Sequence, residues 1–594
     1  MSKKEPSAPA SPTESGTAPP HDGWRDSIES IIFAFLLALL FKTFEAEMFV
    51  IPTGSMAPTL YGRHKEATCS ECGHHIVVGA SSELDHDDGT FDSRVTESIC
   101  PNCRAINPQI FDGPPFNGDR ICVAKYPYEF WEPSRWDVFV FKFPLKPQTN
   151  YIKRLVGLPG ETIRLRNGNV YLWDGEKEQI LRKAPDKQRA IQIPVHDNAY
   201  VSEKLLAAGW PERWAAVVRT EDVAGIDGWK ETDASVWKFN GQTRSFAVDS
   251  SNTEWAWVRY RHYAPGVQDW RDVEEDRKSI PQPRLVGDFC SYNAFDVGPL
   301  DGKRSRSLQI DEGPFWVPDL TVSCQLKIES VSQNPEVMLE LTEGVLRYRC
   351  RIDVSTGSAI LEEVNVQMSE QDVRQLVTVE TSLRGPGTYD LEFANVDDRL
   401  CLWINGRLVE FGESANLTVP GATSNPFPTD GDLTPVGVAA HGVQATLSEL
   451  RISRDIYYRG VDAEDSAFLV EDFVGDLSLC LSEPSAWSDT YMEKAAQYDY
   501  TEIVIPEDRF LALGDNSPAS YDGRLWTGTE TVPREFLVGK AFCVYWPHGV
   551  PFLNGGNGYS CWPFYHKTRR GEVTDYPTHT FPFYPQFWRM KRIR

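Results

Sequence analysis

The sequence lacks an excess of basic residues, because 85 acidic residues stand against 60 basic ones and the formal net charge is −25. A protein that binds nucleic acid needs a basic face for its phosphate contacts. The charge balance therefore argues against a nucleic-acid-binding protein, and we expect no nucleic-acid partner.

Long hydrophobic runs are also scarce near the N-terminus. The unbroken apolar run from Ile31 to Phe41 has only eleven residues, whereas a helix needs about 20 to span a bilayer. Residues 28–50 are long enough if their charged side chains lie near the interfaces. No convincing small-residue cleavage site follows the run. We predict a retained single-pass transmembrane anchor over residues 27–48, with a buried or surface-lying helix as the alternative.

The segment before this run is rich in Ser, Pro, Ala and Thr and has no hydrophobic periodicity. Residues 1–26 are therefore predicted to form a disordered tail. Because Lys3, Lys4 and Arg25 precede the apolar run, the positive-inside rule places this tail in the cytoplasm. Everything after about residue 50 is then expected on the outer side of the cytoplasmic (inner) membrane.

The cysteine spacing does not suggest a disulfide framework, although it does not exclude one. Eight of the twelve cysteines are scattered singly, as small buried hydrophobes often are. The others form two CxxC pairs, Cys69/Cys72 and Cys100/Cys103. Four thiolates on two tight turns match the tetrahedral preference of Zn²⁺. We predict a structural zinc and a zinc-ribbon-like insertion over 67–111, in preference to two redox pairs.

Three stretches carry candidate chemistry: Phe49–Leu60 (FVIPTGSMAPTL), Tyr151–Glu161 (YIKRLVGLPGE) and Phe510–Arg524 (FLALGDNSPASYDGR). The first holds Ser55 on a turn, and a serine nucleophile needs a neighbouring base. In this order, behind a hydrophobic segment, the stretches resemble bacterial type I signal peptidases. These are membrane-anchored serine endopeptidases with a serine-lysine pair. The resemblance covers about a third of the chain.

The resemblance implies that Ser55 is the nucleophile and Lys153 the general base, with no cofactor for catalysis. A free lysine has a pKa of about 10.4, and burial among apolar neighbours can lower it by several units. The resemblance also implies that the Ser55 N–H and the Thr53 hydroxyl stabilise the oxyanion. Many relatives carry serine where this chain has Thr53.

Further roles follow from the same resemblance. Ser520 would orient the lysine amine, Asp522 and Arg524 would form an ion pair that holds their loop, and Asp515 would pair with Arg154. The substrate pocket would accept only small side chains. Its candidate residues are Ile51, Pro52, Met56, Leu60, Tyr151 and Ile152.

Alternating apolar and polar residues over Tyr389–Val409, with turns at Asp397-Asp398 and Asn405-Gly406, resemble the central strands of laminin-G/concanavalin-like jelly rolls. Such sandwiches bind glycans in some proteins and serve as scaffolds in others, and the sequence does not name a ligand. The C-terminal residues 554–594 are aromatic and basic, and they suit either an anionic membrane surface or a solvated tail.

The expected fold is thus mainly β: a signal-peptidase-type catalytic domain behind one transmembrane helix, interrupted by a zinc ribbon and a jelly-roll sandwich. The catalytic domain is predicted in three parts, 49–66, 112–172 and 463–553. The large insertion is predicted as a connecting region, 173–235, and a sandwich, 236–462.

The predicted function is removal of signal peptides from exported preproteins, with preproteins and the lipid bilayer as partners. A glycan or protein ligand of the sandwich is a further possible partner. Two alternative functions stay open. One is a surface glycan-binding or adhesion protein with a vestigial peptidase body, and the other is a self-processing serine-lysine protease. A Ser/His/Asp triad also stays open, although none of the eleven histidines lies in a recognisable motif.

Overall fold

The structure is a computed structural model of the chain. It describes residues 23–40, 46–84, 93–111, 113, 115–220, 226–233, 235–250, 254–299, 313–366, 373–417, 427–462, 467–468, 481–495, 500–554, 558–560, 564–567, 573–576 and 580–594. The described part is mainly β, as predicted. Most of the predicted disordered tail, residues 1–22, lies outside the described residues.

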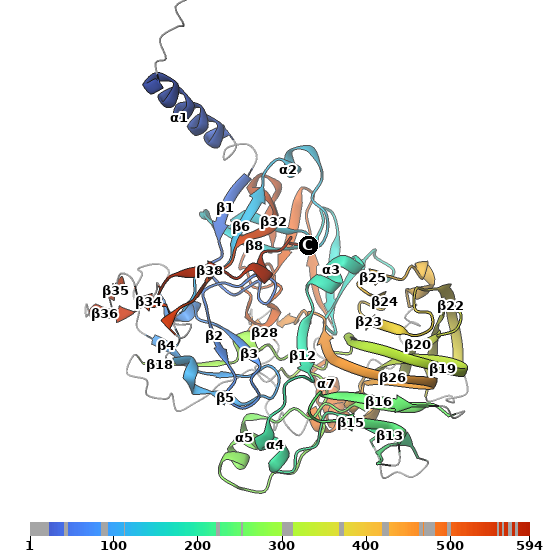
Figure 1. The fold of residues 1–594 in the computed structure, drawn as a ribbon. Coiled ribbons are helices and arrows are strands. Elements are labelled where there is room, and N and C mark those ends of the chain that lie inside the picture. The colour runs from blue at the N-terminus through green and yellow to red at the C-terminus, as the bar shows by residue number, and fades with distance from the viewer. Residues whose placement is uncertain are drawn as a thin grey trace, which may run out of the picture.

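The N-terminal helix α1 (Gly23–Leu40) projects away from the rest of the protein (Figure 1). Among the described segments, no helix combines the length and the apolar character needed to cross a membrane. The bounds predicted for the anchor, 27–48, also differ from the structure, because the helix ends at Leu40 and strand β1 begins at Ala46. Exposure alternates along β1, and Phe49 packs against a buried apolar core. Because residues 46–50 form a strand of a sheet, they do not extend the helix.

The part predicted to be catalytic, which we call the catalytic part, is built on an antiparallel seven-stranded sheet in the order β1-β6-β32-β7-β8-β30-β31. All three predicted parts of the catalytic domain contribute strands to it, so segments far apart in sequence become neighbours. Its strands are β1 (Ala46–Val50), β6 (Arg120–Ala124), β7 (Val138–Phe143), β8 (Lys146–Gly157), β30 (Arg509–Leu513), β31 (Thr531–Pro533) and β32 (Leu537–Trp546).

A second, four-stranded sheet has the order β11-β10-β9-β29. Asn167 and Gly168 connect β9 and β10 with positive φ angles of 50° and 81°, as the predicted two-residue hairpin requires. The four strands are β9 (Thr162–Arg166), β10 (Asn169–Trp173), β11 (Glu178–Ile180) and β29 (Thr501–Val504).

The first insertion contains a hairpin of β2 (His64–Thr68) and β3 (His75–Gly79), followed by β4 (Ser93–Ile99) and β5 (Ile106–Asn107). Strand β4 also pairs with β18 (Phe295–Pro299), which belongs to the large insertion. In addition, the indole N–H of Trp270 donates a hydrogen bond to the carbonyl of Cys103 at 2.9 Å. The two insertions therefore pack against each other.

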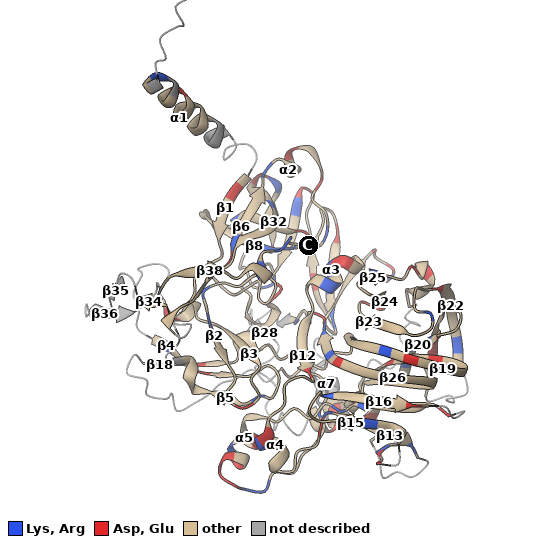
Figure 2. Cartoon of the chain, viewed as in Figure 1, with Lys and Arg blue, Asp and Glu red and all other residues tan. Residues whose placement is uncertain are grey.

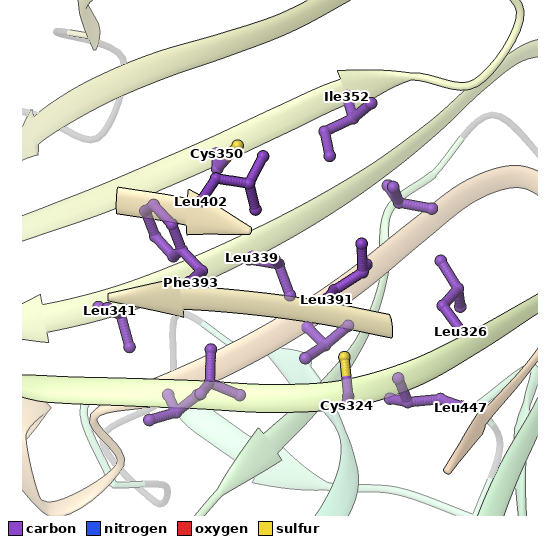
Figure 3. Close-up of a cluster of buried hydrophobic side chains, with 14 of the residues drawn as sticks. Cys324, Leu326, Leu339, Leu341, Cys350, Ile352, Leu391, Phe393, Leu402 and Leu447 are labelled. Carbon is purple, nitrogen blue, oxygen red and sulfur yellow. The ribbon is translucent and has the colours of Figure 1, made fainter. Parts of the chain in front are cut away.

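The large insertion is organised around two long strands, β19 (Leu320–Glu343) and β26 (Val436–Arg454), which pair along most of their length. Strand β19 pairs with β23 through its first half and with β20 through its second half. Apolar side chains from all of these strands, including Leu326, Leu341 and Leu391, meet in one core (Figure 3).

The predicted turns of this module are present, since Asp397, Asp398, Asn405 and Gly406 all have positive φ angles. However, β12, β13 and β14 lie within the predicted connecting region 173–235 and pair into the same sheet. The predicted start of the sandwich at 236 was therefore too late. The remaining strands of this sheet are β12 (Ile193–Asp197), β13 (Trp214–Arg219), β14 (Trp229–Glu231), β15 (Trp237–Asn240), β16 (Ser245–Asp249), β17 (Ala256–Tyr260), β20 (Leu346–Asp353), β21 (Ser358–Asn365), β22 (Val373–Glu380), β23 (Gly387–Asn395), β24 (Leu400–Ile404) and β25 (Arg407–Leu408).

The C-terminal residues return to the catalytic sheet. Arg589 forms an ion pair with Asp119 at 2.6 Å, and the N–H of Val544 donates to the carbonyl of Lys591. Ile593 is buried in the catalytic core. The described end of the predicted tail thus packs against protein.

Short helices and strand pairs complete the described structure. These are α2 (Pro127–Phe130), α3 (Pro185–Ala190), α4 (Glu203–Ala207), α5 (Val267–Glu274) and α7 (Pro484–Ala495), with the pairs β27 (Val461–Asp462) and β28 (Ala467–Phe468), β33 (Gly549–Pro551) and β38 (Phe583–Pro585), β34 (Tyr559–Ser560) and β37 (Thr580–Phe581), and β35 (Phe564–Lys567) and β36 (Val573–Tyr576). Acidic and basic residues are interspersed along the elements visible in Figure 2.

Candidate active site

Ser55 and Lys153, predicted as nucleophile and base, lie side by side. Ser55 is on the turn after β1, and Lys153 is in the second half of β8. Lys153 Nζ is 2.6 Å from Ser55 Oγ. Both residues are nearly buried, with exposed fractions of 9% for Ser55 and 4% for Lys153. The contact is therefore short, direct and largely shielded from solvent.

The environment of Lys153 makes its neutral amine more accessible than that of a free lysine. Burial lowers its pKa to about 8, and the positive charge of Arg524 adds to this effect. The carboxylates of Asp522 and Asp515 act in the opposite direction. A neutral amine can take a proton from a hydroxyl, so near pH 8 a substantial fraction of the molecules has a base in place.

Arg154 lies next to Lys153 in β8, and successive side chains of a strand point to opposite faces. Its guanidinium binds both carboxylate oxygens of Asp515, with distances of 2.7 Å and 2.6 Å. The hydroxyl of Thr59 donates to the same carboxylate at 2.6 Å. Asp515 therefore connects β8, the chain after β30 and the turn that carries Ser55. Thr59 was not among the predicted residues.

The predicted pair of Asp522 and Arg524 is also present. Two contacts of 2.8 Å and 2.7 Å join the guanidinium to the carboxylate, and the N–H of Gly514 donates to Asp522 at 2.9 Å. Burial acts to raise the pKa of Asp522, but the charge and hydrogen bonds of Arg524 outweigh it and hold that pKa below its usual value. This pair fixes the loop after β30.

Ser520 is buried in this loop, but its hydroxyl has no hydrogen-bond partner among the described residues. Ser520, predicted to orient the lysine amine, thus makes no hydrogen bond to Lys153 in this structure. The hydroxyl lies close to the backbone of Gly514, where a Cβ atom would come within 2.1 Å of Ser520 Oγ and 2.5 Å of the Ser55 carbonyl oxygen. Only glycine fits at this position without displacing its neighbours.

Two asparagines that sequence reasoning missed hold the backbone around the nucleophile. The Asn516 backbone N–H donates to the carbonyl of Ser55 at 3.1 Å, and its side-chain amide donates to the carbonyl of Gly54 at 2.9 Å. Asn293 exchanges two amide hydrogen bonds with Asn516, at 2.7 Å and 2.8 Å. Because Asn293 belongs to the large insertion, that insertion supports the nucleophile turn. Asn516 adjoins the predicted Asp515, whereas Asn293 had no motif that could have indicated it.

The predicted oxyanion donors lie at the same turn. Thr53 is exposed and Ser55 is nearly buried. Within the described part of the chain, the N–H of Ser55 makes no hydrogen bond to another backbone group.

The predicted substrate-pocket residues only partly come together. Ile51, Met56, Leu60 and Ile152 share one apolar cluster, which Ile593 from the C-terminus also joins. The two others differ. Pro52 is exposed, and Tyr151 packs against a separate cluster of aromatic residues.

The four predicted zinc ligands also converge. Cys69 and Cys103 have their sulfur atoms 3.6 Å apart, as do Cys72 and Cys100, and all four sulfurs lie within 4.8 Å of one another. A tetrahedral Zn²⁺ with Zn–S bonds of about 2.3 Å requires sulfur separations of about 3.8 Å. The cysteines therefore fit a closed zinc site.

Comparisons with known proteins agree with this arrangement for part of the chain. The family model described as signal peptidase, peptidase S26, matches residues 114–215 and 462–546. These segments include Lys153, Asp515 and Ser520, and begin after Ser55. The catalytic part of the chain is thus similar to signal peptidases.

Individual relatives give the same result over short lengths. Signal peptidase I of Pseudomonas fluorescens is 28% identical over 168 residues, which cover 28% of this chain and 44% of the relative. The probable signal peptidase I-1 of Synechocystis sp. is 26% identical over 180 residues, or 29% of this chain and 63% of the relative. The chain spans less than two thirds of the length of these relatives.

The solved structures that match this chain do so at low sequence identity and with low TM-scores. The carbohydrate binding module CBM66 from Bacillus subtilis has 10% sequence identity and a TM-score of 0.22, covering 40% of this chain and 94% of that module. The Caenorhabditis elegans galectin LEC-6 has 11% identity and a TM-score of 0.17, covering 23% of this chain and 83% of the galectin. TM-scores this low support no conclusion about the ligand of this chain.

Proposed function

We propose that this protein is a serine endopeptidase that removes signal peptides from exported preproteins, with Ser55 as nucleophile and Lys153 as general base. The observation that carries the proposal is the 2.6 Å contact between the hydroxyl and a buried amine whose pKa burial lowers to about 8. The similarity of the catalytic part to signal peptidases supports the choice of substrate.

In the proposed mechanism, the neutral Lys153 amine takes the proton of Ser55 while Oγ attacks the scissile carbonyl. The Ser55 N–H and the Thr53 hydroxyl stabilise the negative charge that develops on the carbonyl oxygen. The lysine then gives its proton to the leaving amine as the peptide bond breaks. A water molecule, deprotonated by the same amine, hydrolyses the acyl-enzyme and releases the signal peptide and the free serine.

The arrangement of the supporting residues favours an active enzyme over a vestigial peptidase body. Asp515 ties the lysine strand to the nucleophile turn, and Asp522 and Arg524 fix the loop beside it. A disused site has no need to retain both buried ion pairs, because each costs desolvation energy unless its partners stay in place. The self-processing alternative has no additional support in the described contacts.

Membrane attachment belongs to the proposal as well. Helix α1 has Ile28, Ile31, Phe33 and Leu36 more than half exposed, and exposed apolar groups of this kind are typical of interaction with a membrane or a partner. We place the catalytic part on the outer side of the cytoplasmic membrane, where the preproteins emerge. Fractionation of cells that express the full chain or a chain lacking residues 1–45 tests this, because loss of the segment should release the protein from membranes.

The decisive test of activity uses a preprotein with an Ala-X-Ala cleavage site. Ser55→Ala and Lys153→Met should each abolish cleavage, whereas Lys142→Met, which changes an exposed lysine of the neighbouring strand β7, should cleave like the wild type. Cleavage that survives either of the first two substitutions would refute the serine-lysine mechanism.

We also propose that Cys69, Cys72, Cys100 and Cys103 hold a structural zinc ion. The convergence of four thiols supports this, since zinc would fix the two turns that carry them. Elemental analysis of wild-type protein and of Cys72→Ser, with Cys324→Ser as the matched control from the sandwich core, tests the proposal. An unchanged zinc content in Cys72→Ser would remove it.

A further inference from the structure

A second cluster of metal-binding side chains lies outside both the catalytic site and the four cysteines. Its members are His64 and Glu66 of β2 and His548, which follows β32. Each offers one ligand atom, and these atoms lie within 4.8 Å of one another. We call these three residues the His64 cluster. Its members come from two parts of the chain that are almost 500 residues apart in sequence.

Strand geometry brings the first two ligands together. Residues two apart in a strand face the same side, so His64 and Glu66 point in one direction. Lys65, between them, forms an ion pair with Glu83 at 2.8 Å. His548 completes the cluster, with its ring centroid 5.0 Å from that of His64.

The spacing of the ligand atoms suits a metal better than hydrogen bonds. His64 Nε2 is 3.5 Å from one oxygen of Glu66, and His548 Nε2 is 3.4 Å from the other. Hydrogen bonds of this type are typically about 2.7–3.2 Å long. Zinc bonds to nitrogen and oxygen of about 2.0–2.1 Å in a tetrahedron place the ligand atoms about 3.3 Å apart.

The histidines are buried without enough hydrogen bonds. His64 is 0% exposed and His548 is 3% exposed. Among the described residues, His64 Nε2, both ring nitrogens of His548 and Glu66 Oε1 have no hydrogen-bond partner. Buried polar atoms are rarely left unpaired, because desolvation without compensation is costly. His64 Nε2 and His548 Nε2 both face the Glu66 carboxylate, so a single partner bound between them would satisfy these atoms.

The tautomer of His64 is suited to that partner. Its Nδ1 lies 2.7 Å from the carbonyl oxygen of Gly62, and a carbonyl can only accept a hydrogen bond. Nδ1 therefore carries a proton, which leaves Nε2, the nitrogen that faces Glu66, as the one that can bind a metal. A second hydrogen bond of this kind is what orients histidine ligands in metal sites.

We propose that His64, Glu66 and His548 bind a divalent transition-metal ion. Two imidazoles and a carboxylate are typical of zinc. His75, whose Nε2 lies 3.2 Å from the second oxygen of Glu66, or a water molecule takes the fourth position. This site is independent of the proposed peptidase activity and of the cysteine site, since it shares no residue with either.

The position of the site suggests what the metal would do. The residue before His64 donates its N–H to the carbonyl of Pro52 at 3.1 Å, and His64 itself exchanges backbone hydrogen bonds with Phe116 at 3.1 Å and 2.7 Å. A metal here would hold the start of the first insertion against the segment after the last catalytic strand. It would thus stabilise the base of the nucleophile turn.

Cobalt(II) distinguishes this site from the cysteine site in the intact protein. Thiolate ligands give cobalt intense charge-transfer absorption in the near ultraviolet, whereas nitrogen and oxygen ligands give only weak visible bands. Metal-free protein titrated with cobalt should bind two equivalents, one with each spectral signature. His548→Gln and, separately, Glu66→Gln should lose one equivalent and the weak visible bands while keeping the thiolate bands.

His441→Gln, which alters a histidine of the sandwich, is the matched control and should bind cobalt like the wild type. Far-UV circular dichroism shows whether each variant folds. Two results would overturn the proposal: a wild type that shows only thiolate bands, or folded His548→Gln and Glu66→Gln variants that both retain the weak visible bands. In either case the three residues do not bind a metal. Failure of the cysteine site alone would remove only the thiolate bands.

Discussion

The buried amine of Lys153 should destabilise the protein while it enables catalysis. Because its pKa is lowered from 10.5 to about 8, the folded protein holds this proton less tightly than the unfolded chain does. A difference of about 2.5 pKa units corresponds to about 3 kcal/mol of the free energy of unfolding. This penalty is fully present below about pH 8 and disappears as the pH rises from about 8 to 10.5.

Lys153→Met removes the titrating group and keeps most of the length and the apolar body of the side chain. Loss of the contact with Ser55 costs about 1 kcal/mol, so the variant should be about 2 kcal/mol more stable than the wild type at pH 7 and should have no activity. Its advantage should shrink steadily between pH 8 and pH 10.5. Urea unfolding followed by tryptophan fluorescence at pH 7, 8, 9 and 10 measures both quantities.

A Lys153→Met protein that is less stable than the wild type at pH 7 would contradict this reasoning. A stability difference that does not change with pH would contradict it as well, because the penalty would then not arise from protonation. Lys142→Met serves as the control, since an exposed lysine should change the stability by less than about 0.5 kcal/mol at every pH.

Further predictions concern the pH profile and the neighbours of the dyad. The kcat/KM of the wild type should rise about tenfold from pH 7 to pH 9, because only the neutral form of an amine with a pKa of about 8 is active; a flat profile would exclude Lys153 as the base. Asn293→Ala should lower kcat about tenfold, measured on the same preprotein, because it leaves the buried amide of Asn516 without its partner; an unchanged kcat would show that the large insertion does not support the site. Gly514→Ala should reduce activity more than tenfold, since its methyl group meets the Ser55 carbonyl at 2.5 Å, and a fully active variant would show that the turn yields easily. Thr59→Val should lower the unfolding free energy by about 1 kcal/mol through loss of the hydrogen bond to Asp515, and unchanged stability would argue against that bond.

The two insertions contact each other, and the large one also packs against the catalytic part. Strand β18 of the large insertion pairs with β4 of the small one, and Tyr292 fits against Gly54, where a Cβ atom would lie 2.2 Å from its ring. Tyr292 also stacks on Tyr61, with ring centroids 5.7 Å apart. The large insertion thus contacts the segment that carries the nucleophile, which gives that insertion a physical role even without a ligand of its own.

Local features with local causes could be predicted from the amino-acid sequence. Alternation of apolar and polar residues indicated the strands, Asn167-Gly168 and Asn405-Gly406 indicated their turns, and the spacing of Cys69 and Cys72 indicated a knuckle. The candidates Ser55 and Lys153 came from motifs, which depend on resemblance and not on geometry. The bounds of the N-terminal helix and the start of the sandwich could not be fixed in this way, because pairing with distant strands decides them.

Which distant residues meet depends on how the whole chain folds. Asn293, Thr59 and the His64 cluster have no signal in their own neighbourhoods, since each acts through contacts with residues that strand pairing brings close. The same holds for the pKa of Lys153, because desolvation depends on everything that surrounds the amine and not on its neighbours in sequence. A sequence specifies which groups are available, while burial and distance, which arise only when the chain has folded, specify what those groups can do.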